Sequence, residues 1–140
     1  MDVLHDINIV IDVLEDRAPF AEPAAALWAK AEARELRASL AATTLTTVYY
    51  ITRKSRGDDV ARRAIADLLR VFDILPVNRA VLEAALVHPS RDFEDAVQDA
   101  AAELAGIAVV VTRDPAGFAG STRRVVDAAT FVAELEARPD

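Results

Sequence analysis

The chain contains no cysteine, which excludes disulfide bonds and thiolate metal sites. Any bound metal ion must therefore be held by oxygen or imidazole ligands. Long apolar runs are also missing, and no stretch approaches the length that a membrane crossing needs. The first residues lack the basic region that opens a secretion signal. These absences predict a cytoplasmic protein that does not associate with a membrane.

Positive charge is scarce. Lys and Arg total 16 against 23 Asp and Glu, which gives a net charge of −7. This balance argues against a protein that coats nucleic acid through bulk positive charge. It leaves room for an enzyme that cuts nucleic acid, because a divalent metal held by carboxylates supplies a positive field locally. With 53% hydrophobic and 28% charged residues, residues 1–140 are predicted to form one folded, soluble domain.

Short apolar runs alternate with longer amphipathic stretches along the whole chain. Strands are predicted at residues 3–7, 39–43, 73–77, 107–112 and 123–126. Helices are predicted through Glu15 and at 19–38, 43–54, 58–72, 78–88, 88–106 and 127–137, with a loop at 113–121. This alternation predicts a three-layer α/β/α sandwich with a central, mainly parallel sheet. Residues 3–7 and 109–111 are expected to be its central strands.

Acidic residues stand where two of the predicted strands end. Asp6 follows the apolar residues Val3 and Leu4, and Asp114 follows the strand at 107–112. In a parallel sheet, ligands collect at the carboxyl ends of the strands. Asp6 is the hardest of these acids to explain structurally, because an unpaired carboxylate in an apolar run costs several kcal/mol.

A third group of acids begins the helix that precedes the strand at 107–112. Asp92, Glu94 and Asp95 lie in its first turn, and Asp99 lies one turn further on the same face. If the three groups converge, their oxygen ligands suit Mg²⁺ or Mn²⁺. Such a site activates water and neutralises a phosphodiester, which is hydrolytic chemistry on nucleic acid.

Each of these polar residues also has a structural explanation. Asp92 is a good N-cap, Glu94 and Asp95 favour the helix dipole, and Asp114 forms a turn pair with Pro115. Asn8 fits as the cap of the first helix, Asp12 as a solvated helix position, and His5 as a packed or exposed histidine. Only their convergence in three dimensions favours a site over these separate roles.

Three sequence blocks resemble the PIN-domain family. They are HDINIVIDVL (5–14), ATTLTTVYYITRK (42–54) and DFEDAVQDAAAELAGIAVVVTRDPAGF (92–118), and they occur in the order typical of the family. PIN domains are metal-dependent ribonucleases, and many small bacterial ones are VapC-like toxins that a cognate antitoxin neutralises. The resemblance thus implies an RNA substrate, an antitoxin partner and Mg²⁺ or Mn²⁺ as cofactor.

The resemblance also implies roles for particular residues. Asp6, Asp95 and Asp114 match the first, third and fourth acids of the family, which are catalytic and bind the metal. Asn8 matches the polar residue that supports the first acid. Glu94 and Asp92 belong to the DFED form of the third block and are further candidate metal ligands.

Two positions depart from the family pattern. Thr47 occupies the place of the usual second acid, so the metal site lacks one carboxylate there, and Asp12, Glu94 or Asp92 is a candidate to replace it. Gly117 stands where many relatives carry an acid in the last loop. The sequence thus predicts the fold of the family more firmly than its activity.

Three functions remain open at this point. The first is a metal-dependent endoribonuclease of the VapC type, with Arg53, Lys54 and Arg56 as candidates for holding RNA. The second is a catalytically weakened PIN-like module that binds RNA or protein. The third, a phosphate-transfer receiver domain, fits the alternation of strands and helices but lacks a lysine after the last strands. A homodimer is also expected, because the helices that carry Leu27, Trp28, Leu36, Leu68, Leu69 and Phe72 offer more apolar surface than one small sheet requires.

Overall fold

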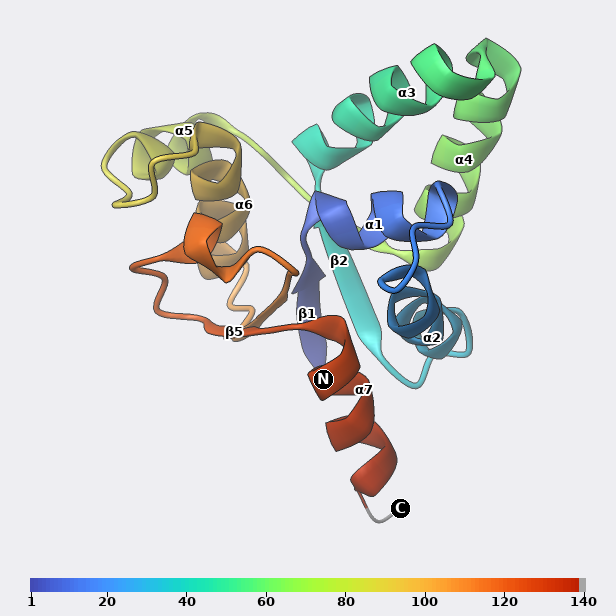
Figure 1. Cartoon of the computed structure of the whole chain (residues 1–140). Helices are drawn as coiled ribbons and strands as arrows, with labels where there is room; N and C mark the ends of the chain where they lie inside the picture. Colours follow the sequence, from blue (N-terminus) through green and yellow to red (C-terminus); the bar gives the residue numbers. More distant parts are fainter. Residues whose placement is uncertain (139–140) are drawn as a thin grey trace.

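The computed structural model describes residues 1–138, which form a parallel sheet covered by helices on both faces (Figure 1). The five strands lie in the order β3-β2-β1-β4-β5, and every neighbouring pair is parallel. The strands are β1 (Asp2–His5), β2 (Arg37–Ala41), β3 (Asp73–Leu75), β4 (Val109–Val111) and β5 (Arg124–Val126). The helices are α1 (Ile7–Leu14), α2 (Ala21–Glu32), α3 (Ala42–Arg56), α4 (Asp58–Val71), α5 (Arg79–Leu86), α6 (Phe93–Leu104) and α7 (Ala128–Ala137), with a 3₁₀ turn η1 at Pro115–Phe118.

Successive residues of β1 point to opposite faces of the sheet and so divide the core in two. Val3 belongs to the core that α1, α2, α3, α4 and α7 cover. Leu4 belongs to the core under α5, α6 and η1. Both residues are fully buried, as are Val110 and Val111 of the neighbouring strand β4. The predicted three-layer sandwich with a parallel sheet is therefore confirmed.

Several element boundaries differ from the prediction. Strand β1 ends at His5 and α1 begins at Ile7, because the side chain of Asp6 accepts a hydrogen bond from the Ile7 amide and caps the helix. Asn8, expected to cap α1, lies inside it. Helix α2 ends at Glu32 rather than near residue 38, and Arg37 and Ala38 pair with β1 instead.

The break predicted at Gly57 is confirmed, and it lets α4 fold back against α3. Gly57 has a φ of 89°, a backbone conformation that glycine adopts without strain. In Figure 1 this pair forms one arm of the molecule, while α5 and α6 form the other. The carboxyl end of β1 and the start of α1 lie between the two arms. None of the helices within residues 1–138 has the length and apolar character that a membrane crossing requires.

Candidate active site

Asp6 stands at the centre of a buried network of neutral donors. Its Oδ1 accepts hydrogen bonds from the Ile7 amide at 2.7 Å and from the Gln98 side chain at 2.9 Å. Its Oδ2 accepts one from the Thr112 hydroxyl at 2.7 Å. The side chain is buried, and all three donors are uncharged. The carboxylate is thus held rigidly while its charge is not neutralised.

Gln98 links Asp6 to the acids at the start of α6. The same amide nitrogen that contacts Asp6 lies 3.4 Å from Asp95 Oδ1. On its other side, Gln98 Oε1 receives a long hydrogen bond from Thr44 at 3.5 Å. Gln98 is completely buried, so this bridge fixes α6 against the carboxyl end of β1 and the first turn of α3.

Asp114 joins the group from the turn after β4. Its backbone amide donates to Thr112 Oγ1 at 2.9 Å, the same hydroxyl that contacts Asp6. A Cβ placed on Gly117 would lie 2.0 Å from Asp95 Oδ2 and 3.7 Å from Asp114 Oδ2. The two carboxylates therefore face the same space beside Gly117. They line one cavity of about 460 Å³ together with Asp92.

The pKa values of Asp95, Asp6 and Glu94 are raised, in part by the charges of the acids around them. Burial and, after it, the charges of Asp6, Asp92, Asp114 and Glu94 together raise the pKa of Asp95 to about 7. The pKa of Asp6 is raised by burial and, less strongly, by Asp114. Burial followed by Asp92 and Asp6 raises that of Glu94. Concentrated negative charge of this kind favours binding of a cation.

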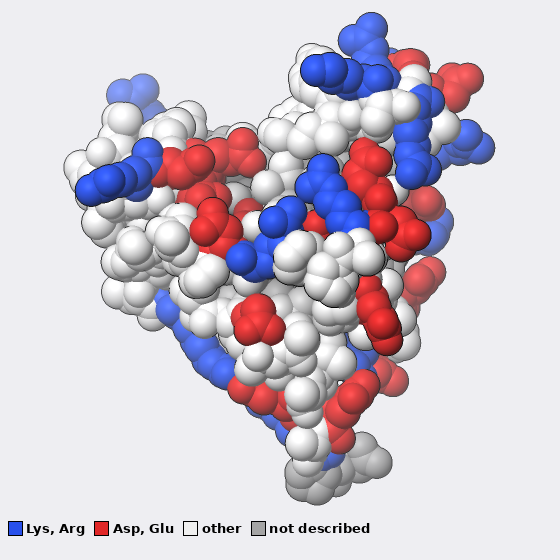
Figure 2. All heavy atoms as spheres, viewed as in Figure 1, with Lys and Arg blue, Asp and Glu red and all other residues white. Residues whose placement is uncertain are grey.

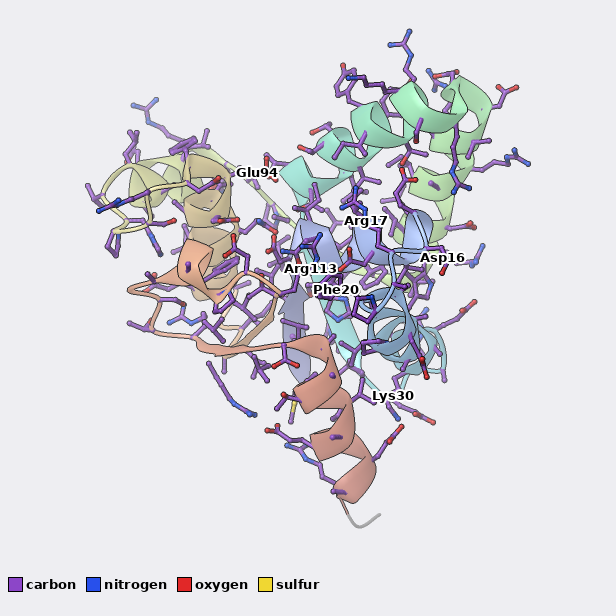
Figure 3. All side chains as sticks on the ribbon, viewed as in Figure 1. Asp16, Arg17, Phe20, Lys30, Glu94 and Arg113 are labelled. Carbon is purple, nitrogen blue, oxygen red and sulfur yellow. The ribbon has the colours of Figure 1, made fainter. Side chains whose placement is uncertain are left out.

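Oxygen ligands with uncompensated charge fit Mg²⁺ or Mn²⁺ chemically. Within residues 1–138, however, no three acidic or histidine side chains are spaced closely enough to form a ready set of metal ligands. The Gln98 amide instead lies between Asp6 and Asp95. Asp6, Asp95 and Asp114 are the residues that would hold an ion, with Glu94 and Asp92 at its edge. Glu94 lies on the rim of the notch between the two arms, where acidic side chains gather (Figures 2 and 3).

The proposed supporting residues lie at the site in different ways. Asn8 donates to Thr112 Oγ1 and accepts from the Arg113 amide, both at 3.4 Å, so it joins α1 to the turn after β4. Thr47 lies one turn after Thr44 in α3, and its hydroxyl donates to the carbonyl of Thr43 in the same helix. The interpretation of Asp12 as a solvated residue is wrong. Asp12 is fully buried and pairs with Arg113 Nε at 2.8 Å.

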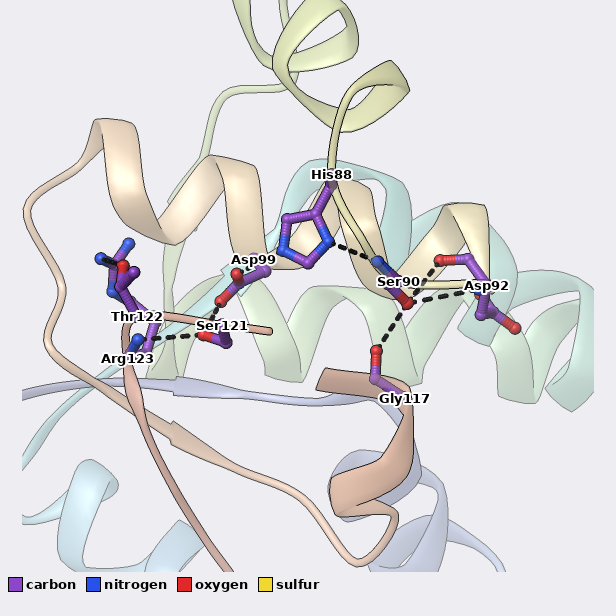
Figure 4. Close-up of polar contacts among 8 residues, drawn as sticks. All are labelled: His88, Ser90, Asp92, Asp99, Gly117, Ser121, Thr122 and Arg123. Atoms are coloured by element: carbon purple, nitrogen blue, oxygen red, sulfur yellow. Dashed lines mark hydrogen bonds and ion pairs between the residues drawn. The ribbon is translucent and has the colours of Figure 1, made fainter. Parts of the chain in front are cut away.

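Asp99 lies outside the acidic cavity, although it follows Asp95 by one turn of α6. Its two oxygens contact His88 Nε2 and the Ser121 hydroxyl, each at 2.7 Å (Figure 4). The His88 ring in turn accepts from the Ser90 amide at 2.9 Å, and Ser90 Oγ donates to the carbonyl of Gly117 at 2.7 Å. This network secures the loop before α6 against η1, beside the cavity.

Two residues of the site, Thr112 and Gln98, were not predicted from the sequence. Thr112 is the polar residue at the end of an otherwise apolar run, the same signal that Asp6 gives at the end of β1. Gln98 lies three positions after Asp95 and so shares its helix face. Both signals are present in the sequence, but a pattern of charged metal ligands does not include neutral donors.

The basic residues predicted to hold RNA lie far from the acids. Arg53, Lys54 and Arg56 are exposed at the C-terminal end of α3, whereas its first turn, at Thr44, contacts the site. A helix of this length extends roughly 20 Å. Arg17 and Arg113 lie closer, at the foot of the notch (Figure 3). RNA binding by the end of α3 stays a prediction.

Comparison with protein families matches residues 2–116 to the PIN domain. The chain belongs to the PIN-domain family. The match extends from the first residue of β1 into η1, so it spans Asp6, Asp95, Asp114 and most of the other residues of the site. No curated protein matches the sequence significantly.

Solved structures similar to this PIN domain include several toxin–antitoxin proteins. The DNA-bound VapBC structure from Salmonella typhimurium is 16% identical, with a TM-score of 0.71 over 91% of this chain and 98% of that one. The sarcin-ricin loop cleaving toxin VapC20 of Mycobacterium tuberculosis is 18% identical, with a TM-score of 0.67 over 85% and 95%. A toxin–antitoxin complex from Klebsiella pneumoniae is 23% identical, with a TM-score of 0.63 over 84% and 91%. At these identities the likeness shows the shared fold.

Proposed function

We propose that this PIN domain is a metal-dependent endoribonuclease and the toxin component of a VapBC-like toxin–antitoxin system. The observation that carries the proposal is a group of acids from three separate parts of the chain. The Gln98 amide bridges Asp6 and Asp95, and Asp95 and Asp114 face the same cavity. Mg²⁺ or Mn²⁺ bound by these acids would supply an activated water and neutralise charge on a phosphodiester. Gln98 and Thr112 keep Asp6 in place through hydrogen bonds to its two oxygens.

The partners follow from the same proposal. Two of the similar structures are a toxin–antitoxin complex and VapBC bound to DNA, which supports a cognate antitoxin for this chain. We also propose a homodimer in the cytoplasm. Most of the apolar residues that the sequence suggested for the dimer interface lie in the core instead. Leu27, Leu36, Leu68 and Phe72 are buried, Trp28 is partly buried and Leu69 is exposed. Exposed Leu82, Leu86 and Val87 at the end of α5 support the dimer instead.

The direct test is cleavage of RNA with and without divalent metal. Purified protein is incubated with a pool of single-stranded RNA in Mn²⁺, in Mg²⁺ and in excess EDTA, and the products are resolved by size. We expect cleavage in either metal and none in EDTA, because the acids repel phosphate until a cation neutralises them. Absence of both cleavage and metal binding would instead support the catalytically weakened binding module that Thr47 makes the second candidate.

Thr47→Glu tests whether the site lacks a carboxylate. Thr47 lies one turn along α3 from Thr44, which contacts Gln98, so a longer acidic side chain there can approach the cavity. We expect Mn²⁺ to bind about tenfold more tightly, measured by titration calorimetry, and cleavage to rise with it. Thr46→Glu, on the exposed neighbouring position, is the matched control and should change neither quantity. Equal metal affinity in wild type and Thr47→Glu would show that Glu94 or Asp92 already fills the role.

A further inference from the structure

Arg113 is a cation held in place beside the acidic cavity. Its Nε donates to Asp12 Oδ2 at 2.8 Å, and its guanidinium lies 4.7 Å from the centre of the Phe20 ring. Asp12 is completely buried, whereas the side chain of Arg113 is 31% exposed. The guanidinium is therefore anchored on its inner side and open to solvent on its outer side.

The anchoring leaves most of the donors of Arg113 free for a ligand. A guanidinium carries five N–H groups in one plane. Among residues 1–138, the guanidinium donates one hydrogen bond, from Nε to Asp12. The Phe20 ring covers one face, so the two Nη groups can act only along the open edge. A planar donor pair with restricted motion is suited to bind a phosphate through two oxygens.

Arg113 lies between the acids and a second cavity. Asp114 lines the acidic cavity, and Arg113 lines a neighbouring cavity of about 370 Å³ with Ile9, Pro19, Phe20 and Pro23. Consecutive residues, Arg113 and Asp114, thus line the two cavities. In Figure 3, Arg113 and Phe20 lie together at the foot of the notch, below the rim that carries Glu94. A polymer bound across the acids would extend over Arg113 into the second cavity.

We propose that Arg113 binds an RNA phosphate adjacent to the one that is cut, and that the apolar cavity beside it receives the attached base. Asp12 is the positioning residue that holds the guanidinium. The inference rests on the proposed ribonuclease function and adds a subsite to it. A fixed cation at this point offsets the repulsion between the acids and the RNA backbone, which the distant basic end of α3 cannot do.

Binding of chemically modified RNA tests the subsite. The probe is a single-stranded oligoribonucleotide that contains the mapped cleavage site, prepared as a series with one phosphate at a time replaced by a neutral methylphosphonate. Affinity is measured in the Asp6→Asn background, so that the RNA stays intact. We expect one methylphosphonate position, next to the cleavage site, to weaken binding about tenfold when Arg113 is present.

Arg113→Gln should weaken binding of unmodified RNA by a similar factor and abolish the effect at that single position. The slope of log affinity against log salt should fall by about 0.7, the value for one phosphate contact on a single strand. Arg113→Lys should recover part of the affinity. Arg17→Gln is the matched control, because Arg17 is exposed nearby, and it should leave the position-specific effect unchanged.

Arg113→Gln leaves Asp12 buried without its partner and can destabilise the fold. The double variant Asp12→Asn/Arg113→Gln removes both charges together and keeps a hydrogen bond possible between the two amides. It should melt close to the wild-type temperature and show the same loss at the same phosphate. Unchanged affinity and an unchanged methylphosphonate profile in the double variant would overturn the subsite. Wild-type protein that neither binds nor cuts RNA would overturn the proposed function itself.

Discussion

Asp6→Asn should abolish RNA cleavage and leave the protein folded. The Asn side chain has the same shape, and its oxygen can accept the hydrogen bonds of Ile7 and Gln98 that Asp6 Oδ1 accepts. Its nitrogen then faces the Thr112 hydroxyl, which can accept as well as donate. The negative charge beside Asp95 and Asp114 is lost. We expect at least a 100-fold fall in cleavage rate, since outer partners of metal ligands alone contribute 10–100-fold.

The same substitution should raise the thermal stability of the metal-free protein. The pKa of Asp6 is raised by burial, so folding disfavours its charged form. That penalty is absent well below the ordinary pKa of an aspartate and grows as the pH rises above it. The melting temperature of Asp6→Asn should therefore exceed that of the wild type at pH 8, and the difference should shrink toward pH 4.

Calorimetry with and without Mn²⁺ separates the two effects of Asp6→Asn. Mn²⁺ should raise the melting temperature of the wild type but not of the variant. Asp59→Asn, an exposed acid in the first turn of α4, removes the same charge away from the site and should behave like the wild type. An Asp6→Asn protein that still cuts RNA at the wild-type rate would remove Asp6 from the active site.

Gly117→Ala should cause the second large loss of activity with little change in stability. A Cβ at this position would lie 2.0 Å from Asp95 Oδ2 and 3.0 Å from its Cγ, which no pair of unbonded atoms tolerates. Because Asp95 is only half-buried, its carboxylate can rotate away, so the fold survives while the acid leaves its place. A displacement of about 1 Å in an active site can cost on the order of 100-fold in rate.

The measurement is the cleavage rate of Gly117→Ala at saturating Mn²⁺, together with its melting temperature. Ala116→Gly is the control, since it alters the same turn without adding an atom near Asp95. We expect near wild-type cleavage from Ala116→Gly, which would attribute the loss in Gly117→Ala to the displaced carboxylate rather than to a loosened turn. Full activity in Gly117→Ala would show that Asp95 is not required where the structure places it.

The same contact explains the glycine at position 117. Many PIN domains carry an acid there, but in this chain the space is taken by the Asp95 carboxylate. The space that a side chain at position 117 would need is therefore filled by the carboxylate of Asp95. No comparable contact explains Thr47, whose hydroxyl bonds within its own helix.

The sequence by itself determined the order of strands and helices and the parallel sheet. Apolar runs such as residues 107–112 are too short for buried helices and too uniformly apolar for a solvated sheet face, so they indicated central strands. The same logic located Asp6 and Asp114, because a polar residue directly after a buried strand marks the edge of a parallel sheet. Both signals depend only on residues that are neighbours along the chain, so the sequence alone shows them.

Only the tertiary structure decided which polar side chains meet. Asp95, Gln98 and Asp99 lie within two turns of one helix. Gln98 donates to Asp6 and to Asp95, whereas Asp99 contacts His88 and Ser121. Asp12 reads as a surface position in the sequence, and its burial depends on Arg113, which lies 101 residues away along the chain. A carboxylate is stable in the core only with such a partner, and the partner is fixed by the packing of α1 against the turn after β4. Pairings over this distance have no local pattern, so the fold alone selects them.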